Sequence, residues 1–156
     1  MAVKKPVVIT NGQLQQLQAG DSLPSENIYE RTNNNAGAIV IGQPVYVDGA
    51  GTVDTAQADA LATANVLGLV ADTSISAAAS GGIQTGGRLT ATTGEWDAVT
   101  GQTGGLTAGA KYFLDASASG SLTTTAPTTD GEVVAPVGEA LSTTEMEIDI
   151  DQTILL

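Results

Sequence analysis

An alternating acidic stretch is the clearest polar pattern in the chain. Residues 145–151 have the sequence EMEIDID. Alternation with a period of two is typical of a β-strand with one buried and one exposed face. Four carboxylates on one face can collect Ca²⁺ or Mg²⁺, but the spacing of a cation-binding loop is missing. The pattern therefore favours a solvated face that discourages association between sheet edges. The acids are Glu145, Glu147, Asp149 and Asp151.

The single tryptophan lies between two acids in GEWDAVTGQTGG, residues 94–105. In a carbohydrate-binding protein, Trp96 would stack on a sugar while Glu95 and Asp97 bound its hydroxyl groups. A tryptophan more often anchors a core or an interface, and this is the interpretation that we favour. The glycine-rich stretch GGIQTGG at 81–87 lacks the spacing of phosphate-binding loops and predicts turns or bulges.

Residues that most enzymes depend on are missing from this chain. It has no His and no Cys, which removes the usual general base, the thiol nucleophile, and imidazole and thiolate metal ligands. We therefore expect no catalytic residues, no cofactor and no metal centre. A hydrolytic pair of carboxylates stays an alternative because acids are numerous, although nothing marks one pair as special.

The net charge of −12 is unevenly distributed. Residues 1–31 are neutral, whereas residues 32–156 hold only Arg88 and Lys111 against fourteen acids. Phosphate groups would repel such a body, so we expect neither nucleic acid nor an anionic membrane as a partner. The first residues, MAVKKPVVIT, contain too short an apolar run for a signal peptide or a membrane span, which favours synthesis in a cytoplasm.

Short strands separated by turn residues predict an all-β body over residues 38–156, a compact sandwich or barrel. Residues 111–115 and 122–125 are predicted to form a hairpin around Tyr112 and Phe113. The alanine-rich residues 55–64 leave helix and loop open. Because only 3% of the residues are aromatic, the core is thin, and we expect burial to extend across subunits.

A weak internal repeat relates the two halves of the body. VYVD at 45–48 is followed by TV at 52–53 and LGLVADT at 67–73; YFLD at 112–115 is followed by LT at 122–123 and VGEALST at 137–143. Asp48 and Asp115 are 67 positions apart, and Gly68 and Gly138 are 70 apart. We predict that both halves are one hairpin-plus-strand unit, each supplying part of a sheet.

Residues 1–37 differ in composition and predict an extended N-terminal arm. Residues 7–10 suit a short strand, Asn11-Gly12 is a turn dipeptide, and residues 13–18 form a polar run with Leu14 and Leu17 on one helical face. The arm has too few large apolar groups to fold alone. We expect it to order against a partner surface, its own body or a neighbouring copy.

The chain resembles the small virion structural proteins of tailed bacteriophages. The segments that carry the resemblance are VVITNGQLQQLQAGDSL, NAGAIVIGQPVYVDGAGTV, VLGLVADTSI, GGIQTGGRLTATTGEWDAVTG and GLTAGAKYFLDASASGSLTTTAPTTDGEVVAPVGEALSTTEMEI. Such modules serve as capsid decoration (cement) or head-fibre proteins, and similar ones occur in tail fibres and baseplates. The resemblance implies a homotrimer on the outer capsid surface of the virion, made in the host cytoplasm, with the major capsid protein as partner.

The arm is the expected capsid-binding segment. Residues 7–10 would add a strand to a capsid-protein sheet, and two lysines would lie over acidic patches. The capsid-binding candidates are Lys4, Lys5, Val7, Val8, Ile9, Leu14 and Leu17. Three alternatives stay open: a tail-fibre or baseplate component, a carbohydrate-binding surface module, and a carboxylate-dependent glycosidase.

Overall fold

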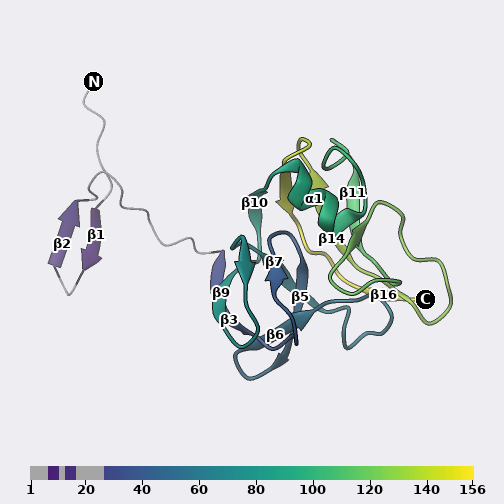
Figure 1. Cartoon of the computed structure of the whole chain (residues 1–156), viewed down its shortest axis with the longest axis horizontal. Coiled ribbons are helices and arrows are strands. Elements are labelled where there is room, and N and C mark those ends of the chain that lie inside the picture. Colours follow the sequence, from purple (N-terminus) through teal and green to yellow (C-terminus); the bar gives the residue numbers. More distant parts are fainter. Residues whose placement is uncertain (1–6, 11–12, 17–26) are drawn as a thin grey trace.

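The computed structural model describes residues 7–10, 13–16 and 27–156 (Figure 1). The predicted all-β class is confirmed, because strands dominate the described residues and one helix, α1 (Thr93–Thr100), accompanies them. Near the N-terminus, β1 (Val7–Thr10) pairs with β2 (Gln13–Gln16) as a separate two-stranded antiparallel sheet. The strand predicted at 7–10 is therefore present.

Residues 28–84 form a closed five-stranded barrel. Four of its strand pairs are antiparallel, and a parallel pair between β3 and β6 closes it. The barrel strands are β3 (Ile28–Asn33), β5 (Pro44–Gly49), β6 (Thr52–Thr55), β7 (Val66–Val70) and β9 (Ser80–Gln84). Two short strands, β4 (Ile39–Val40) and β8 (Ser74–Ile75), pair with each other. One buried cluster joins the barrel to these short strands: Ile39, Val45, Val53, Val70, Ile75 and Ile83.

An open five-stranded antiparallel sheet follows the barrel. Its strands are β10 (Gly87–Thr90), β11 (Lys111–Leu114), β12 (Leu122–Thr123), β14 (Pro136–Ala140) and β15 (Glu145–Ile148). The hairpin predicted around Tyr112 and Phe113 is confirmed as β11 and β12, with Phe113 opposite Thr123. β13 (Val133–Val134) pairs with β16 (Ile154–Leu155) in a separate ribbon.

The barrel and the open sheet have the same topology. In chain order, the first strand of each pairs with the fifth, and the order across the sheet is first, fifth, fourth, second, third. Val45 faces Gly68 and Tyr112 faces Gly138, and the register shifts immediately after both pairs. The predicted internal repeat is confirmed at the level of strand register, but each copy forms a complete five-stranded sheet of its own and does not supply part of one sheet. Residues 28–84 are the first repeat and residues 87–148 are the second.

The repeats differ at one seam. The first and third strands of the first repeat, β3 and β6, pair in parallel and close the barrel. The equivalent strands of the second repeat, β10 and β12, do not pair, and the sheet stays open. Helix α1 follows β10 in the chain and contacts β12. The helix thus occupies the seam that a strand pair closes in the barrel.

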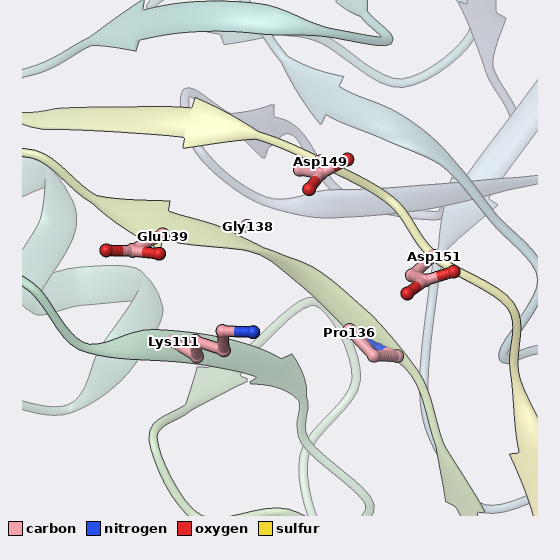
Figure 2. A pocket seen from close by; sticks show the side chains of 6 residues that line it. All are labelled: Lys111, Pro136, Gly138, Glu139, Asp149 and Asp151. Carbon is pink, nitrogen blue, oxygen red and sulfur yellow. The ribbon is translucent and has the colours of Figure 1, made fainter.

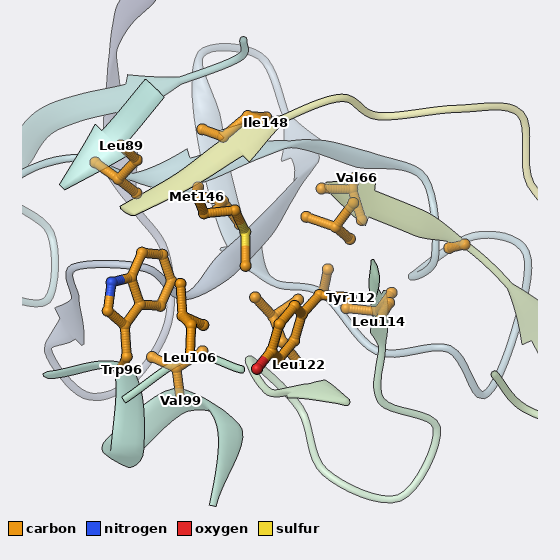
Figure 3. Packing of buried hydrophobic residues seen from close by; sticks show 14 of the residues in the cluster. Val66, Leu89, Trp96, Val99, Leu106, Tyr112, Leu114, Leu122, Met146 and Ile148 are labelled. Carbon is orange, nitrogen blue, oxygen red and sulfur yellow. The ribbon is translucent and has the colours of Figure 1, made fainter. Parts of the chain in front are cut away.

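The large core lies between the repeats (Figure 3). Val66 and Leu69 of the barrel share one buried cluster with Trp96, Tyr112 and Met146 of the second repeat. In Figure 3 the Trp96 indole, on α1, lies beside the strands that carry Leu89 and Met146. Apolar burial of this kind is the main stabilising contribution in a folded protein, so the repeats form one body.

The β body begins earlier in the chain than the sequence predicts. The predicted boundary falls after residue 37, yet β3 begins at Ile28 and is part of the barrel. Asn33 is fully buried, and its amide donates to the carbonyl oxygens of Gly37 and Ile75, both at 2.9 Å. These bonds hold a polar side chain inside the barrel, where an unpaired amide would be costly. The triple-Asn stretch is therefore structural and does not mark a linker.

One open alternative is decided and one helical expectation is wrong. Residues 55–64 end β6 and continue as turns, which leaves the loop interpretation. Residues 13–16 form β2, so Leu14 has no helical face there, and Leu17 lies outside the described residues. Pairing with β1 overrides the weak helical spacing of this polar run, because so short a run does not offset the cost of nucleating a helix.

Helix α1 is defined by its caps. Thr92 accepts a hydrogen bond from the Glu95 backbone, and the Glu95 carboxylate accepts from the Thr92 N–H at 2.7 Å, which is a capping box. Gly101 ends the helix at φ 65°, a left-handed conformation that glycine adopts without strain. These local signals explain a helix in an all-β chain.

The capping box predicts a pH-dependent difference between two variants. The bonds from the Thr92 backbone and side chain lower the pKa of Glu95. A lowered folded-state pKa stabilises the protein above the unfolded pKa, and this contribution is lost as pH falls through the folded value. We expect Glu95→Gln to lower the free energy of unfolding at pH 7, with a gap from wild type that narrows below about pH 4. Urea titrations from pH 3 to 7 measure the gap, and a constant gap would contradict the assignment.

Candidate functional site

The predicted acidic strand is present, and its apolar residues are inside. Met146 and Ile148 are 0% and 4% exposed, whereas Glu147 is exposed. β15 ends at Ile148, so Asp149 and Asp151 follow the strand in an irregular segment. The four acids therefore do not share one regular strand face. Across the described ranges 7–10, 13–16 and 27–156, no group of three or more acidic, His or Cys side chains is placed to hold a metal ion.

A row of four charged residues crosses the second sheet. Arg88 on β10 faces Glu147 on β15, Glu147 faces Glu139 on β14, and Glu139 faces Lys111 on β11. Residues directly opposite in antiparallel strands have neighbouring side chains, so the two carboxylates repel each other. A base at each end of the row offsets this repulsion. Arg88 also forms an exposed ion pair with Glu145 at 3.5 Å.

The row ends beside a small pocket of about 90 Å³ (Figure 2). Lys111, Glu139, Asp149 and Asp151 contribute the charges around it, and Pro136 and Gly138 complete its lining. In Figure 2, Lys111 and Glu139 extend from neighbouring strands β11 and β14, and Asp149 and Asp151 come from the segment that follows β15. The pocket has room for a few water molecules. It is an acidic surface hollow, not an enclosed reaction site.

The equivalent positions of the first repeat explain why this face is charged. Pro44 and Leu69 occupy the places of Lys111 and Glu139. Both are buried, and Leu69 is part of the core shared with the second repeat. The same register position is therefore apolar where the repeats meet and charged where the sheet contacts solvent. The sequence alone shows the charges, but their arrangement in a row depends on strand register.

The tryptophan stretch is not a sugar site. Trp96 is 0% exposed and its Nε1 donates to the Thr144 carbonyl oxygen at 3.0 Å. Asp97 accepts hydrogen bonds from the backbone N–H groups of Gly104 and Gly105, at 3.1 and 2.7 Å. Glu95 caps the helix. The core-anchor interpretation of Trp96 is confirmed, and all three residues have structural roles.

A second polar cluster lies on the outside of the barrel. Asn34 donates to the Asp48 carboxylate, and Asn35 donates to Asp54 at 2.7 Å. Burial raises the pKa of Tyr46, and the nearby Asp54 carboxylate raises it further. The amides and carboxylates are paired with each other, and Tyr46 stays protonated at neutral pH. The cluster stabilises the strand ends and provides no activated nucleophile.

The predicted capsid-binding residues divide into two groups. Val7, Val8 and Ile9 lie on β1 and Leu14 lies on β2. Lys4, Lys5 and Leu17 lie outside the described residues, as does the Asn11-Gly12 turn dipeptide. The pairing of β1 with β2 places Ile9 opposite Leu14. Four of the seven candidates are therefore brought together in one two-stranded sheet.

In GGIQTGG, Gly81 and Gly82 lie in regularly paired β9, so the prediction of turns or bulges is wrong for them. Gly86 lies in the connection between β9 and β10, and Gly87 begins β10 with φ 74°, which agrees with a turn there. No helix in the described parts of the chain is long and apolar enough to cross a membrane.

No protein-family model matches the chain, and comparison with curated proteins finds no relative.

Proposed function

We propose that this chain is a structural protein of a phage particle that decorates the outer surface of the major capsid lattice and stabilises the head. The observation that carries this proposal is the small N-terminal sheet. β1 and β2 pair with each other and are not part of either sheet of the body. An isolated two-stranded hairpin is marginally stable in water, so it gains most by adding to another sheet.

The body supports the same role. It is a doubled β unit with a continuous core, and its charged residues are arranged for solubility and strand pairing. We infer that it acts as a compact, non-enzymatic block presented in many copies, as a homotrimer. A head protein of this kind is made in the host cytoplasm and binds capsid protein, without nucleic acid, membrane or cofactor. Its strong negative charge favours solubility at high copy number.

Deleting residues 2–20 tests the anchor. We expect the truncated chain to remain soluble and folded, because the barrel begins at Ile28, and to lose binding to capsids that lack this protein. Co-sedimentation with such capsids measures occupancy. The matched control is Leu61→Glu, an exposed change on the body that leaves the N-terminal sheet intact. Unchanged occupancy of the truncated chain would show that the body, and not the arm, is the anchor.

A tail-fibre or baseplate component is the second candidate, because similar modules occur there. Copy number separates the two. Quantitative gel analysis of purified particles would give hundreds of copies for a decoration protein and at most dozens for a tail component. A glycan-binding role loses its main support because Trp96 is buried. Glycan-array binding by the purified protein would revive it through other residues.

A further inference from the structure

Equivalent surfaces of the two repeats have different neighbours. In the first repeat, the turn at Gly42 is buried under the second repeat, and a Cβ there would lie 2.8 Å from the Trp96 ring. In the second repeat, the equivalent turn at Gly109 is exposed and has no atom within 4 Å of its Cβ position. The surface that the first repeat buries against the second repeat is therefore exposed at the equivalent position of the second repeat. We call this exposed surface the free counterpart.

The free counterpart carries an exposed apolar residue. Leu141 is 45% exposed, and its equivalent in the first repeat, Ala71, packs against the core between the repeats. Gly109 is fixed beside it, since its N–H donates to the Ala140 carbonyl oxygen at 2.7 Å. Leu141 itself is held by a 2.8 Å bond from its N–H to the Glu145 carbonyl oxygen. We call the exposed residues Ala108, Gly109 and Leu141 the Leu141 patch.

Carboxylates border the Leu141 patch. Glu139 lies two residues before Leu141 on β14, and Glu145 begins β15 on the other side of the hairpin. Glu139 faces a second acid, Glu147, across the strand pair. Glu145 is already paired with Arg88, whereas Glu139 lies between Lys111 and Glu147 in the row of charges. The patch therefore has an apolar centre and one edge carboxylate, Glu139, that suits a cation on a partner surface.

A surface of this complementary kind lies on the first repeat. Ile28 and Tyr29, at the start of β3, are 42% and 47% exposed. The Arg31 guanidinium lies over the Tyr29 ring at 5.7 Å. In the second repeat the position of Tyr29 is taken by Leu89, which is 4% exposed under α1. Ile28 points to the opposite side of β3 from Tyr29, so we call Tyr29 and Arg31, which share one side of the strand, the Tyr29 patch. Tyrosine and arginine are enriched among the residues that contribute most to protein interfaces.

We propose that copies of this chain associate head to tail, with the Tyr29 patch of one copy on the Leu141 patch of the next. Tyr29 would cover the Gly109 turn as Trp96 covers the Gly42 turn within the chain, and Arg31 would meet Glu139. Because the two patches are different surfaces, the contact is heterologous and forms a ring where the rotation closes. This inference rests on the self-association in the proposed function and gives it its surfaces.

The absence of cysteine allows a direct test. Tyr29→Cys and Leu141→Cys proteins are prepared separately, mixed, and treated with a short bis-maleimide. We expect covalent dimers in the mixture and none with either protein alone. A chain that carries both changes should give a covalent ladder up to the full ring. The matched control mixes Tyr29→Cys with Leu61→Cys protein. Leu61 is 49% exposed and lies outside both patches, so this mixture should give no covalent dimer.

Charge reversal gives an independent measurement on the full chain. Arg31→Glu should raise the dissociation constant of self-association about tenfold, and adding Glu139→Arg should restore part of the loss. Analytical ultracentrifugation measures both. An oligomer by light scattering without the mixed crosslink would overturn these surfaces and leave self-association standing. A monomer at micromolar concentration would overturn both the proposed surfaces and self-association. Covalent dimers from Tyr29→Cys protein alone would overturn the head-to-tail contact and indicate a symmetric one.

Discussion

Replacing Trp96 by alanine is expected to lower the free energy of unfolding by about 3–5 kcal/mol, the usual cost of removing a large buried aromatic side chain. Trp96 is fully buried in the core that joins the two repeats, and its ring lies against the Gly42 turn. The change also leaves the Thr144 carbonyl oxygen without the indole N–H that it accepts from. Urea denaturation followed by circular dichroism measures the loss.

Two control variants separate the contributions of Trp96. Trp96→Phe keeps an aromatic ring and removes the hydrogen bond, so a smaller loss of about 1–3 kcal/mol is expected. Leu61→Ala changes an exposed apolar residue and should stay within about 0.5 kcal/mol of wild type. If Trp96→Ala matched Leu61→Ala, the indole would not be a core anchor, and the sugar-stacking interpretation would regain its basis.

The sequence predicted well those features that depend on local pattern. The alternation of EMEI predicted which residues of β15 are buried, and the spacing of VYVD and YFLD predicted two copies of one unit. The copies are recognisable because each needs a glycine at the same register position, Gly68 or Gly138. A position that admits only glycine in both copies stays recognisable in the sequence even where the other side chains differ.

The misses come from long-range pairing and from one overlooked cap. The Gln- and Asn-rich composition of residues 11–35 predicts an arm that includes β3, whereas the place of β3 in the barrel depends on partners in β6 and β9. Thr92 and Glu95 have capping-box spacing, but the glycine and threonine residues around them favour turns, so the local sequence does not single out helix α1. The charged row across the second sheet required register, which an isolated sequence does not specify.

The second large effect is expected for Gly138→Ala and Gly68→Ala, each lowering the free energy of unfolding by about 2–3 kcal/mol or more. A Cβ at Gly138 would lie 2.2 Å from the Glu147 carbonyl oxygen, and one at Gly68 would lie 2.3 Å from that of Gln84. Both obstacles are backbone atoms of the neighbouring strand. Relief therefore requires the strands to move apart, which weakens the ladder hydrogen bonds that define each sheet.

Gly94→Ala is the matched control for these glycine variants. Gly94 lies in α1 with no atom within 4 Å of its Cβ position, and alanine there should stabilise the chain by up to about 1 kcal/mol. Because Gly68 and Gly138 occupy one position of a duplicated unit, their losses should be similar in urea titrations. A large loss at one position and none at the other would mean that the two strand pairs contribute differently to the free energy of unfolding. The two repeats would then share a strand order and register but not equivalent packing.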